Sequence, residues 1–227
     1  MLAALANPRR KVRRILATTN ALARLTAAGA TFPAAPEPAT PRDLDRLLGG
    51  DAVHQGVAIE AAPLPPLGVE SLAGAHLIVV LDQVTDPHNV GAVLRSAAAF
   101  DADAVVTTTR HAPAETGVLA KAASGALDAI GWVEASNLAR ALDAIGETGF
   151  TIVGLDGAAD LTVAEAIRGG RIALVLGAEG KGLRQLTRQK CHALARIPVA
   201  AAIGSLNVSN AAAIALYVAR LRLQAGL

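Results

Sequence analysis

His76-Leu-Ile-Val-Val-Leu-Asp-Gln-Val84 decides the fold, because this apolar run is followed by Asp86-Pro87 and then by a helical pattern from Val90 to Phe100. A continuous apolar run rich in β-branched residues is typical of a strand buried on both faces. The alternation of strand and helix continues to the end of the chain. It predicts an α/β fold with a mostly parallel sheet and helices on both faces.

The other strands expected in this sheet share the apolar composition of the first. They are Asp103 to Thr108, Trp132 to Ala135, Phe150 to Leu155, Arg171 to Gly177 and Leu194 to Val199. We expect all of them to be central and buried on both faces. The helices expected between and after them are Pro113 to Ser124, Ser136 to Thr148, Thr162 to Arg168, Leu183 to Lys190 and Asn207 to Leu223. Thr162 and Glu165 are spaced as a capping box.

A proline-rich stretch, Ala61-Ala-Pro-Leu-Pro-Pro-Leu-Gly68, disfavours helix and central strand and predicts a stiff connector. We therefore expect a small α/β domain over residues 1–60, a linker over 61–70 and a larger domain over 71–227. The small domain should contain a basic helical segment, strands at Arg14 to Thr18 and Val57 to Glu60, and helices at 20–28 and 41–48. Because no strand-forming run precedes these elements, we expect this domain to lack its opening strand and to be N-terminally truncated.

The composition excludes several classes of protein. Hydrophobic residues make up 52% of the chain, but its apolar stretches are much shorter than the roughly 18 residues of a membrane span. The N-terminus does not resemble a secretory signal, so we expect a cytoplasmic protein without a membrane partner. Cys191 is the single cysteine and the five histidines are scattered, which predicts no metal site. Although His192 adjoins Cys191, we expect a small buried or semi-buried side chain there and not a nucleophile.

Basic residues gather near the N-terminus without acidic residues among them. They are Arg9, Arg10, Lys11, Arg13 and Arg14. Such a cluster suits RNA phosphates, and it also fits the solvated end of a helix. The net charge of +2 does not distinguish these possibilities, and aromatic residues are only 2%. A stacking platform for single-stranded bases is therefore not expected, and shape and backbone contacts should dominate any binding of RNA.

Three polar segments follow predicted strand ends, where open parallel sheets bind their ligands. In the first, Leu81 to Arg95, Asn89 can open the helix, Gly91 permits a close approach and Arg95 lies further along the helix. An arginine in that position is also compatible with a surface ion pair. The segment is therefore a candidate site whose function the spacing alone leaves open.

The second segment is the glycine loop Leu176-Gly-Ala-Glu-Gly-Lys-Gly182, which offers bare backbone amides and a carboxylate, Glu179, able to accept hydrogen bonds from a ribose. A plain turn explains the glycines equally well. The third segment runs from Ile197 to Asn210, with Ser205 and Asn207 entering the last helix. Each of these two residues alone could be an ordinary helix cap. Three such segments together are less easily explained as caps.

The three segments resemble the signature motifs of the SpoU (TrmH-like) branch of the SPOUT RNA methyltransferases, in order and spacing. The residues that carry the resemblance are Asp86-Pro-His-Asn-Val-Gly-Ala-Val-Leu-Arg95, Leu176-Gly-Ala-Glu-Gly-Lys-Gly-Leu183 and Ile197-Pro through Ser205-Leu-Asn-Val-Ser209. Ala52-Val-His-Gln-Gly56 also resembles the end of the N-terminal substrate-binding domain in the members that modify guanosine in bacterial 23S rRNA. Lys181 and Asn210 depart modestly from the pattern.

The resemblance implies a trefoil-knotted domain that works as a homodimer and transfers a methyl group from S-adenosylmethionine to a ribose 2'-hydroxyl in structured RNA, 23S rRNA first. The implied cofactor contacts are Leu155, Leu176, Gly177, Ile197 and Leu206. The reacting ribose would meet Asn89, Arg95, Glu179, Ser205 and Asn207. Because a guanidinium stays protonated, we expect Arg95 to stabilise the developing alkoxide and leave the base unassigned.

Three alternatives remain open at this point. One is ribose methylation of tRNA. Another is a non-catalytic RNA-binding or ribosome-assembly protein that kept the fold, against which the complete set of candidate catalytic residues counts. The third is a small-molecule methyltransferase, against which the basic N-terminal cluster counts.

Overall fold

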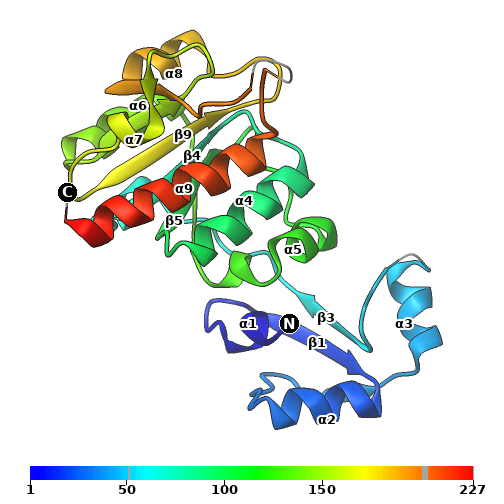
Figure 1. Cartoon of the computed structure of the whole chain (residues 1–227). Helices are drawn as coiled ribbons and strands as arrows, with labels where there is room; N and C mark the ends of the chain where they lie inside the picture. The colour runs from blue at the N-terminus through cyan, green and yellow to red at the C-terminus, as the bar shows by residue number, and fades with distance from the viewer. Residues whose placement is uncertain (51, 201–203, 227) are drawn as a thin grey trace. The chain divides into compact units, whose positions relative to one another are not determined.

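The chain divides into two compact units. The computed structural model describes residues 1–50, 52–200 and 204–226, and residues 201–203 of the third polar segment lie outside them. Contacts separate Met1–Pro65 from Pro66–Leu227, so the boundary falls inside the proline-rich stretch (Figure 1). After this boundary, Leu67 exchanges backbone hydrogen bonds with Trp132 and Glu134 and thereby joins the second unit.

The second unit is built on a seven-stranded sheet of order β6-β5-β4-β9-β7-β10-β8. The strands are β4 (Leu77–Asp82), β5 (Ala104–Thr108), β6 (Gly131–Ala135), β7 (Thr151–Leu155), β8 (Leu161–Thr162), β9 (Ile172–Gly177) and β10 (Ala193–Arg196). Every pairing recorded between these strands is parallel. The predicted α/β class with a mostly parallel sheet is confirmed.

Helices cover both faces of this sheet. They are α4 (Pro87–Ala99), α5 (Gly117–Ala123), α6 (Leu138–Glu147), α7 (Val163–Ala166), α8 (Gln185–Lys190) and α9 (Val208–Ala225), with short 3-10 turns η1 (Val69–Leu72) and η2 (Ala126–Asp128). Alternate residues of β4 explain the two layers: Val79 packs with α4, α5, α7 and α9, whereas Val80 packs with α6 and η1. Figure 1 shows α4 and α9 side by side across the sheet.

Two expectations about the strands are wrong. Trp132 to Ala135 is not central, because β6 is an edge strand that pairs only with β5 and with the short bridge at Leu67. The strand expected at Leu194 to Val199 is β10, which ends at Arg196 and is only partly buried because its outer neighbour β8 has just two residues. An apolar sequence alone does not separate a central strand from an edge strand that loops cover.

The helix starts follow local capping chemistry. Asn89 does not open α4: Asp86 is the N-cap, its carboxylate accepts from the His88 amide at 3.1 Å, and Pro87 occupies the first turn. A proline is favoured there because its missing amide proton needs no partner. The capping box of Thr162 and Glu165 at α7 is confirmed. Gly91 permits the close approach expected of it, since an added Cβ would lie 2.4 Å from the Ala122 Cβ on α5.

The first unit is a three-stranded sheet of order β2-β1-β3 with three helices. Its elements are α1 (Leu2–Ala6), β1 (Val12–Ala17), α2 (Thr19–Ala27), β2 (Pro36–Pro38), α3 (Pro41–Leu48) and β3 (Val57–Ala61). The strand β1 pairs in parallel with β2 and antiparallel with β3. Ile15 lies at the centre of a small core with Leu5 and Leu25. Among the described residues of the chain, no helix is long and apolar enough to cross a membrane.

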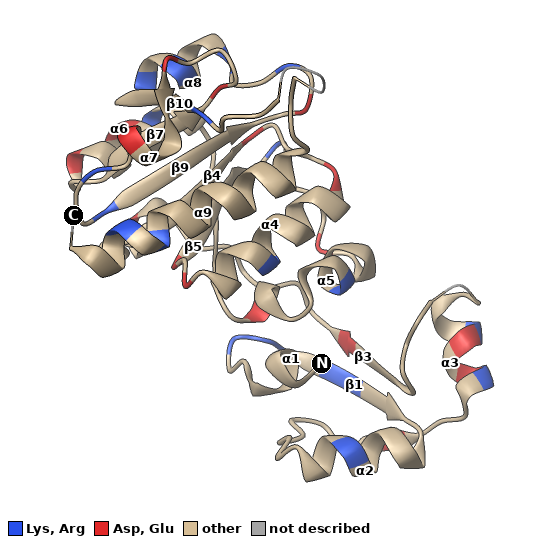
Figure 2. Cartoon of the chain, in the orientation of Figure 1, with Lys and Arg blue, Asp and Glu red and all other residues tan. Residues whose placement is uncertain are grey.

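The basic segment near the N-terminus is not helical, contrary to expectation. It is a loop that runs into β1 (Figure 2). In β1, Ile15 and Ala17 face the core, whereas Arg13 and Arg14 are exposed. Burial of every second residue, as at Ile15 and Ala17, is the pattern of a strand and not of a helix. The exposed positive charge of this segment is also smaller than the sequence implies. Arg14 forms two hydrogen bonds to Glu37, at 2.8 and 2.6 Å, and Arg10 is buried.

Candidate active site

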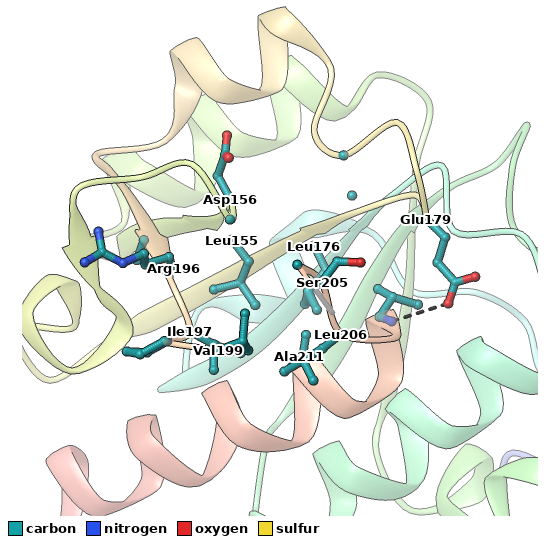
Figure 3. A pocket seen from close by; sticks show the side chains of 17 residues that line it. Leu155, Asp156, Leu176, Glu179, Arg196, Ile197, Val199, Ser205, Leu206 and Ala211 are labelled. Atoms are coloured by element: carbon teal, nitrogen blue, oxygen red, sulfur yellow. Dashed lines mark hydrogen bonds between the residues drawn. The ribbon is translucent and has the colours of Figure 1, made fainter. Parts of the chain in front are cut away.

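A cavity of about 550 Å³ opens at the carboxyl ends of β7, β9 and β10. Apolar side chains form much of its wall, with Leu155 from the end of β7, Leu176 from β9 and Leu206 from the loop before α9 (Figure 3). All the residues expected to contact a cofactor line this apolar cavity: Leu155, Leu176, Gly177, Ile197 and Leu206. The residues that the family resemblance implies as cofactor contacts therefore meet in one cavity.

The glycine loop after β9 folds tightly onto itself. The Gly182 amide donates to the Ala178 carbonyl at 2.8 Å, and Gly180 and Gly182 have φ angles of +74° and +64°. A Cβ added at Gly177 would lie 2.1 Å from the Gly182 carbonyl carbon, so only glycine fits at this crossing. The interpretation as a specialised loop is favoured over that of a plain turn.

A buried ion pair fixes the end of the glycine loop. The Asp82 carboxylate at the end of β4 is fully buried, and it accepts from Arg184 Nε at 2.6 Å and from the Arg184 amide at 3.0 Å. The side chain of Arg184 stays 45% exposed. Since β4 is the neighbour of β9, the loop leaves one strand and is bound to the next. Asp82 was not among the residues that the sequence singled out.

Asn89, Glu179 and Asn207 form a polar cluster that joins all three sequence segments. Asn207 Nδ2 donates to Glu179 Oε1 at 2.6 Å and to Asn89 Oδ1 at 3.0 Å, and Asn89 Nδ2 donates to Glu179 Oε1 at 3.3 Å. The Val208 amide adds a bond of 3.4 Å to the same carboxylate oxygen, drawn in Figure 3. Asn207 also caps α9. Asn207 is therefore both the N-cap of α9 and a member of the polar cluster.

Of the remaining candidate catalytic residues, one reaches the site and one does not. Ser205 lines the apolar cavity with Glu179. Arg95 is exposed on α4 and does not line the cavity. It follows Asn89 by six residues, which places it about 9 Å further along the helix axis. Within the part of the chain that the structure describes, no ion pair engages its guanidinium.

The sequence reading missed Asp156, Arg196, Val199 and Ala211, which also line the cavity. Asp156 directly follows β7, so the strand-end rule could have found it. Its carboxylate forms an ion pair with Arg188 and accepts from the Ala158 amide at 2.9 Å. Arg196 ends β10 and donates to the carbonyls of Ala159 and Asp160, both at 2.7 Å. Figure 3 shows Arg196 and Glu179 at opposite ends of the cavity, with apolar side chains between them.

Cys191 is half-buried, within the range expected for it. Burial raises the pKa of its thiol to about 12, and the sulfur donates to the Thr187 carbonyl at 3.3 Å. His192 accepts from the Ile152 amide at 3.1 Å. Across residues 1–50, 52–200 and 204–226, no three His, Cys, Asp or Glu side chains gather as metal ligands.

The fold is a parallel α/β sheet whose carboxyl edge carries an apolar cavity, a glycine loop and an amide–carboxylate cluster. Open parallel sheets bind their ligands at this edge, so the fold and the site define an α/β protein that binds a small ligand there. Comparison with known proteins gives the family. The model of the SpoU rRNA Methylase family matches residues 76–217, which include all three segments. The chain belongs to this family.

Individual relatives agree with this assignment. The chain is 41% identical over 183 residues to the 23S rRNA (guanosine-2'-O-)-methyltransferase RlmB of Pseudomonas aeruginosa, covering 78% of this chain and 73% of the relative. The Escherichia coli K12 protein of the same name is 42% identical over 176 residues, covering 74% and 72%. In fold, the chain is similar to the SpoU methyltransferase AviRb of Streptomyces viridochromogenes, solved with AdoMet, at a TM-score of 0.80, 23% identity and coverage of 99% and 88%.

Proposed function

We propose that this protein is an S-adenosylmethionine-dependent RNA methyltransferase that modifies the ribose 2'-hydroxyl of a guanosine in 23S rRNA. The observation that carries the proposal is that Glu179 belongs both to the wall of the apolar cavity and to the polar cluster. A cofactor in the cavity and a ribose at the cluster would therefore be neighbours. Relatives about 40% identical over most of the chain carry this activity in their names.

The apolar cavity fits the cofactor in size and chemistry. Its volume of about 550 Å³ lies within the range of roughly 300–1,000 Å³ typical of small-ligand sites. Leu155, Leu176 and Leu206 offer apolar cover for an adenine, and the bare backbone at Gly177 and Gly182 offers polar groups at close range. When bound, S-adenosylmethionine supplies the electrophilic methyl group.

The residues of the chain contribute orientation and electrostatics. We assign Asn89 and Asn207 to hold the Glu179 carboxylate, whose second oxygen is then available to a ribose hydroxyl. Ser205, on the cavity wall, is placed to contact the same ribose. Arg95 supplies positive charge for the developing alkoxide, with the base for its proton left unassigned.

We further propose a homodimer and a trefoil knot. Since Arg95 stands apart from the polar cluster within one chain, a second copy is the natural way to complete the site. The strand order supports the knot, because the connection from β9 to β10 crosses β7. Exposed Ile214, Tyr217 and Leu221 form an apolar stripe along α9, which is the kind of surface that a partner buries.

The dimer is tested by the paired substitutions Ile214→Glu and Leu221→Glu, which place charge in the stripe and spare the ring contact of Tyr217 with Phe100. We expect light scattering at micromolar concentration to give twice 22.9 kDa for the wild type and one chain mass for the variant. Leu47→Glu, at an exposed leucine on α3 of the first unit, is the control and should stay dimeric. A wild-type monomer that methylates RNA contradicts the proposal.

We propose that the first unit binds the RNA substrate, chiefly through exposed Lys11 and Arg13. Arg13 lies 3.9 Å from Glu60 Oε1, a looser contact than the two hydrogen bonds of Arg14 to Glu37, and Arg10 is buried. Phosphate contacts of this kind add affinity without reading sequence. The unit thus has a smaller basic surface than the run of arginines alone implies.

The function is tested by incubating the purified protein with S-adenosylmethionine and unmodified transcripts of 23S rRNA and of tRNA, with a metal chelator present. We expect a single 2'-O-methylguanosine in the 23S rRNA transcript, mapped by primer extension, and cofactor binding in calorimetry. Methylation of tRNA alone would favour that alternative. Cofactor-free RNA binding without methylation would favour a ribosome-assembly protein.

A further inference from the structure

A second cavity, of about 230 Å³, lies at the carboxyl ends of β5 and β6 and is separate from the apolar cavity. Arg110 and Arg184 both line it, and no acidic side chain of the described residues does so. Asp82 takes only Nε of Arg184, which leaves the terminal nitrogens of that guanidinium for another partner. Two guanidinium groups around one small space favour an anion between them.

The N-terminus of α6 opens onto the same cavity. Asn137 is the cap, and its side chain accepts from the Arg140 amide at 3.2 Å. Leu138 and Ala139, the first helical residues, line the cavity, and amides at these positions have no partner within a helix. Together with the helix dipole, they add positive potential to the cavity.

Thr187 gives an independent indication of a ligand. It is only 2% exposed and lines this cavity, and no hydrogen-bond partner of its hydroxyl is found in the part of the chain that the structure describes. By contrast, Thr108 on the same wall bonds His111 Nδ1 at 2.9 Å, and Gln83 bonds His111 Nε2 at 3.3 Å. The Thr187 hydroxyl is therefore available to donate to an anion in the cavity.

We propose that this cavity binds a phosphodiester group of the substrate RNA near the modified nucleotide. The inference rests on the proposed function. Both sites lie at the carboxyl ends of neighbouring strands, because β4 adjoins β5 and β9, and Arg184 follows the glycine loop that carries Glu179. One RNA strand can place a ribose at the polar cluster and a phosphate between Arg110 and Arg184. A phosphate bound there also holds the end of the glycine loop.

The test is the binding of a 23S rRNA transcript to Arg110→Gln, with Arg140→Gln as the matched control, since Arg140 is exposed and does not line the cavity. We expect Arg110→Gln to weaken RNA binding about tenfold and to lower the salt-dependence slope by about one. Its affinity for S-adenosylmethionine should equal that of the wild type. Thr187→Val, which removes the hydroxyl at nearly constant shape, should weaken RNA binding in the same direction.

A second arm separates RNA from a free anion by titrating inorganic phosphate. Micromolar phosphate binding that Arg110→Gln abolishes, with unchanged RNA affinity, overturns the proposal. Equal RNA affinity and salt slope for Arg110→Gln and Arg140→Gln overturn it as well. If the wild type methylates the transcript while these variants behave alike, only the cavity inference fails. If the wild type modifies no RNA, the proposed function itself fails.

Discussion

Arg95→Ala should lower the single-turnover rate of methylation by about 10²–10³-fold, the usual loss when one donor to a developing oxyanion is removed. The affinity for S-adenosylmethionine should stay within about twofold of the wild type, because the interaction is stronger in the transition state than in the ground state. Alanine is a good helix former, and Arg95 is exposed on α4. Loss of folding therefore does not account for the expected effect.

Arg95→Lys separates shape from charge. It should restore little activity, since an ammonium cannot reproduce the planar two-pronged contact of a guanidinium with a phosphate and an alkoxide. Arg140→Ala, at an exposed position on α6, is the control and should leave the rate unchanged. Near wild-type single-turnover rates for Arg95→Ala at saturating RNA would mean that Arg95 is only a docking residue, and its assignment to the alkoxide would be wrong.

Local sequence rules located most of the fold and the polar strand-end segments, and the family resemblance supplied the cofactor contacts in the apolar cavity. Apolar runs identify the strands, and polar residues after strand ends identify Glu179 and Ser205, because parallel strands bring their carboxyl ends to one edge. These rules gave wrong predictions where the surrounding residues, and not the local sequence pattern, determine the structure. Asn89 is a residue type that often caps helices, but Asp86 and Pro87 come before it and already begin α4. The arginines before Ile15 belong to a strand because Ile15, in the same strand, packs into the core of the first unit.

Long-range pairings were out of reach of the sequence. Asp82 and Arg184 are 102 positions apart, and nothing in the spacing of either residue indicates the other. The same limit applies to the second cavity, where Arg110 follows β5 and Thr187 lies on α8. For Arg95 the family resemblance names the residue, whereas the fold of the single chain places it on α4 away from the wall of the apolar cavity. The proposed second copy or the bound substrate would bring it to the polar cluster.

Asp82→Ala should cost the second unit about 3 kcal/mol of unfolding free energy, which is the lower end of the cost of breaking a buried ion pair. The lower end applies because Arg184 remains 45% exposed and can be rehydrated after its partner is lost. The substitution also removes the acceptor of the Arg184 amide, so the glycine loop loses its attachment to β4. Cofactor affinity should therefore fall together with stability.

Two further variants distinguish positioning of the loop from mere stability. Asp82→Asn keeps an acceptor for the Arg184 amide and should recover part of the cofactor affinity. Asp160→Ala, at an exposed carboxylate beyond β7, should change the unfolding free energy by less than about 0.5 kcal/mol. Urea titration and calorimetry on the same proteins measure both quantities. If Asp82→Ala binds S-adenosylmethionine like the wild type under conditions where it is folded, the ion pair stabilises the sheet but does not hold the loop.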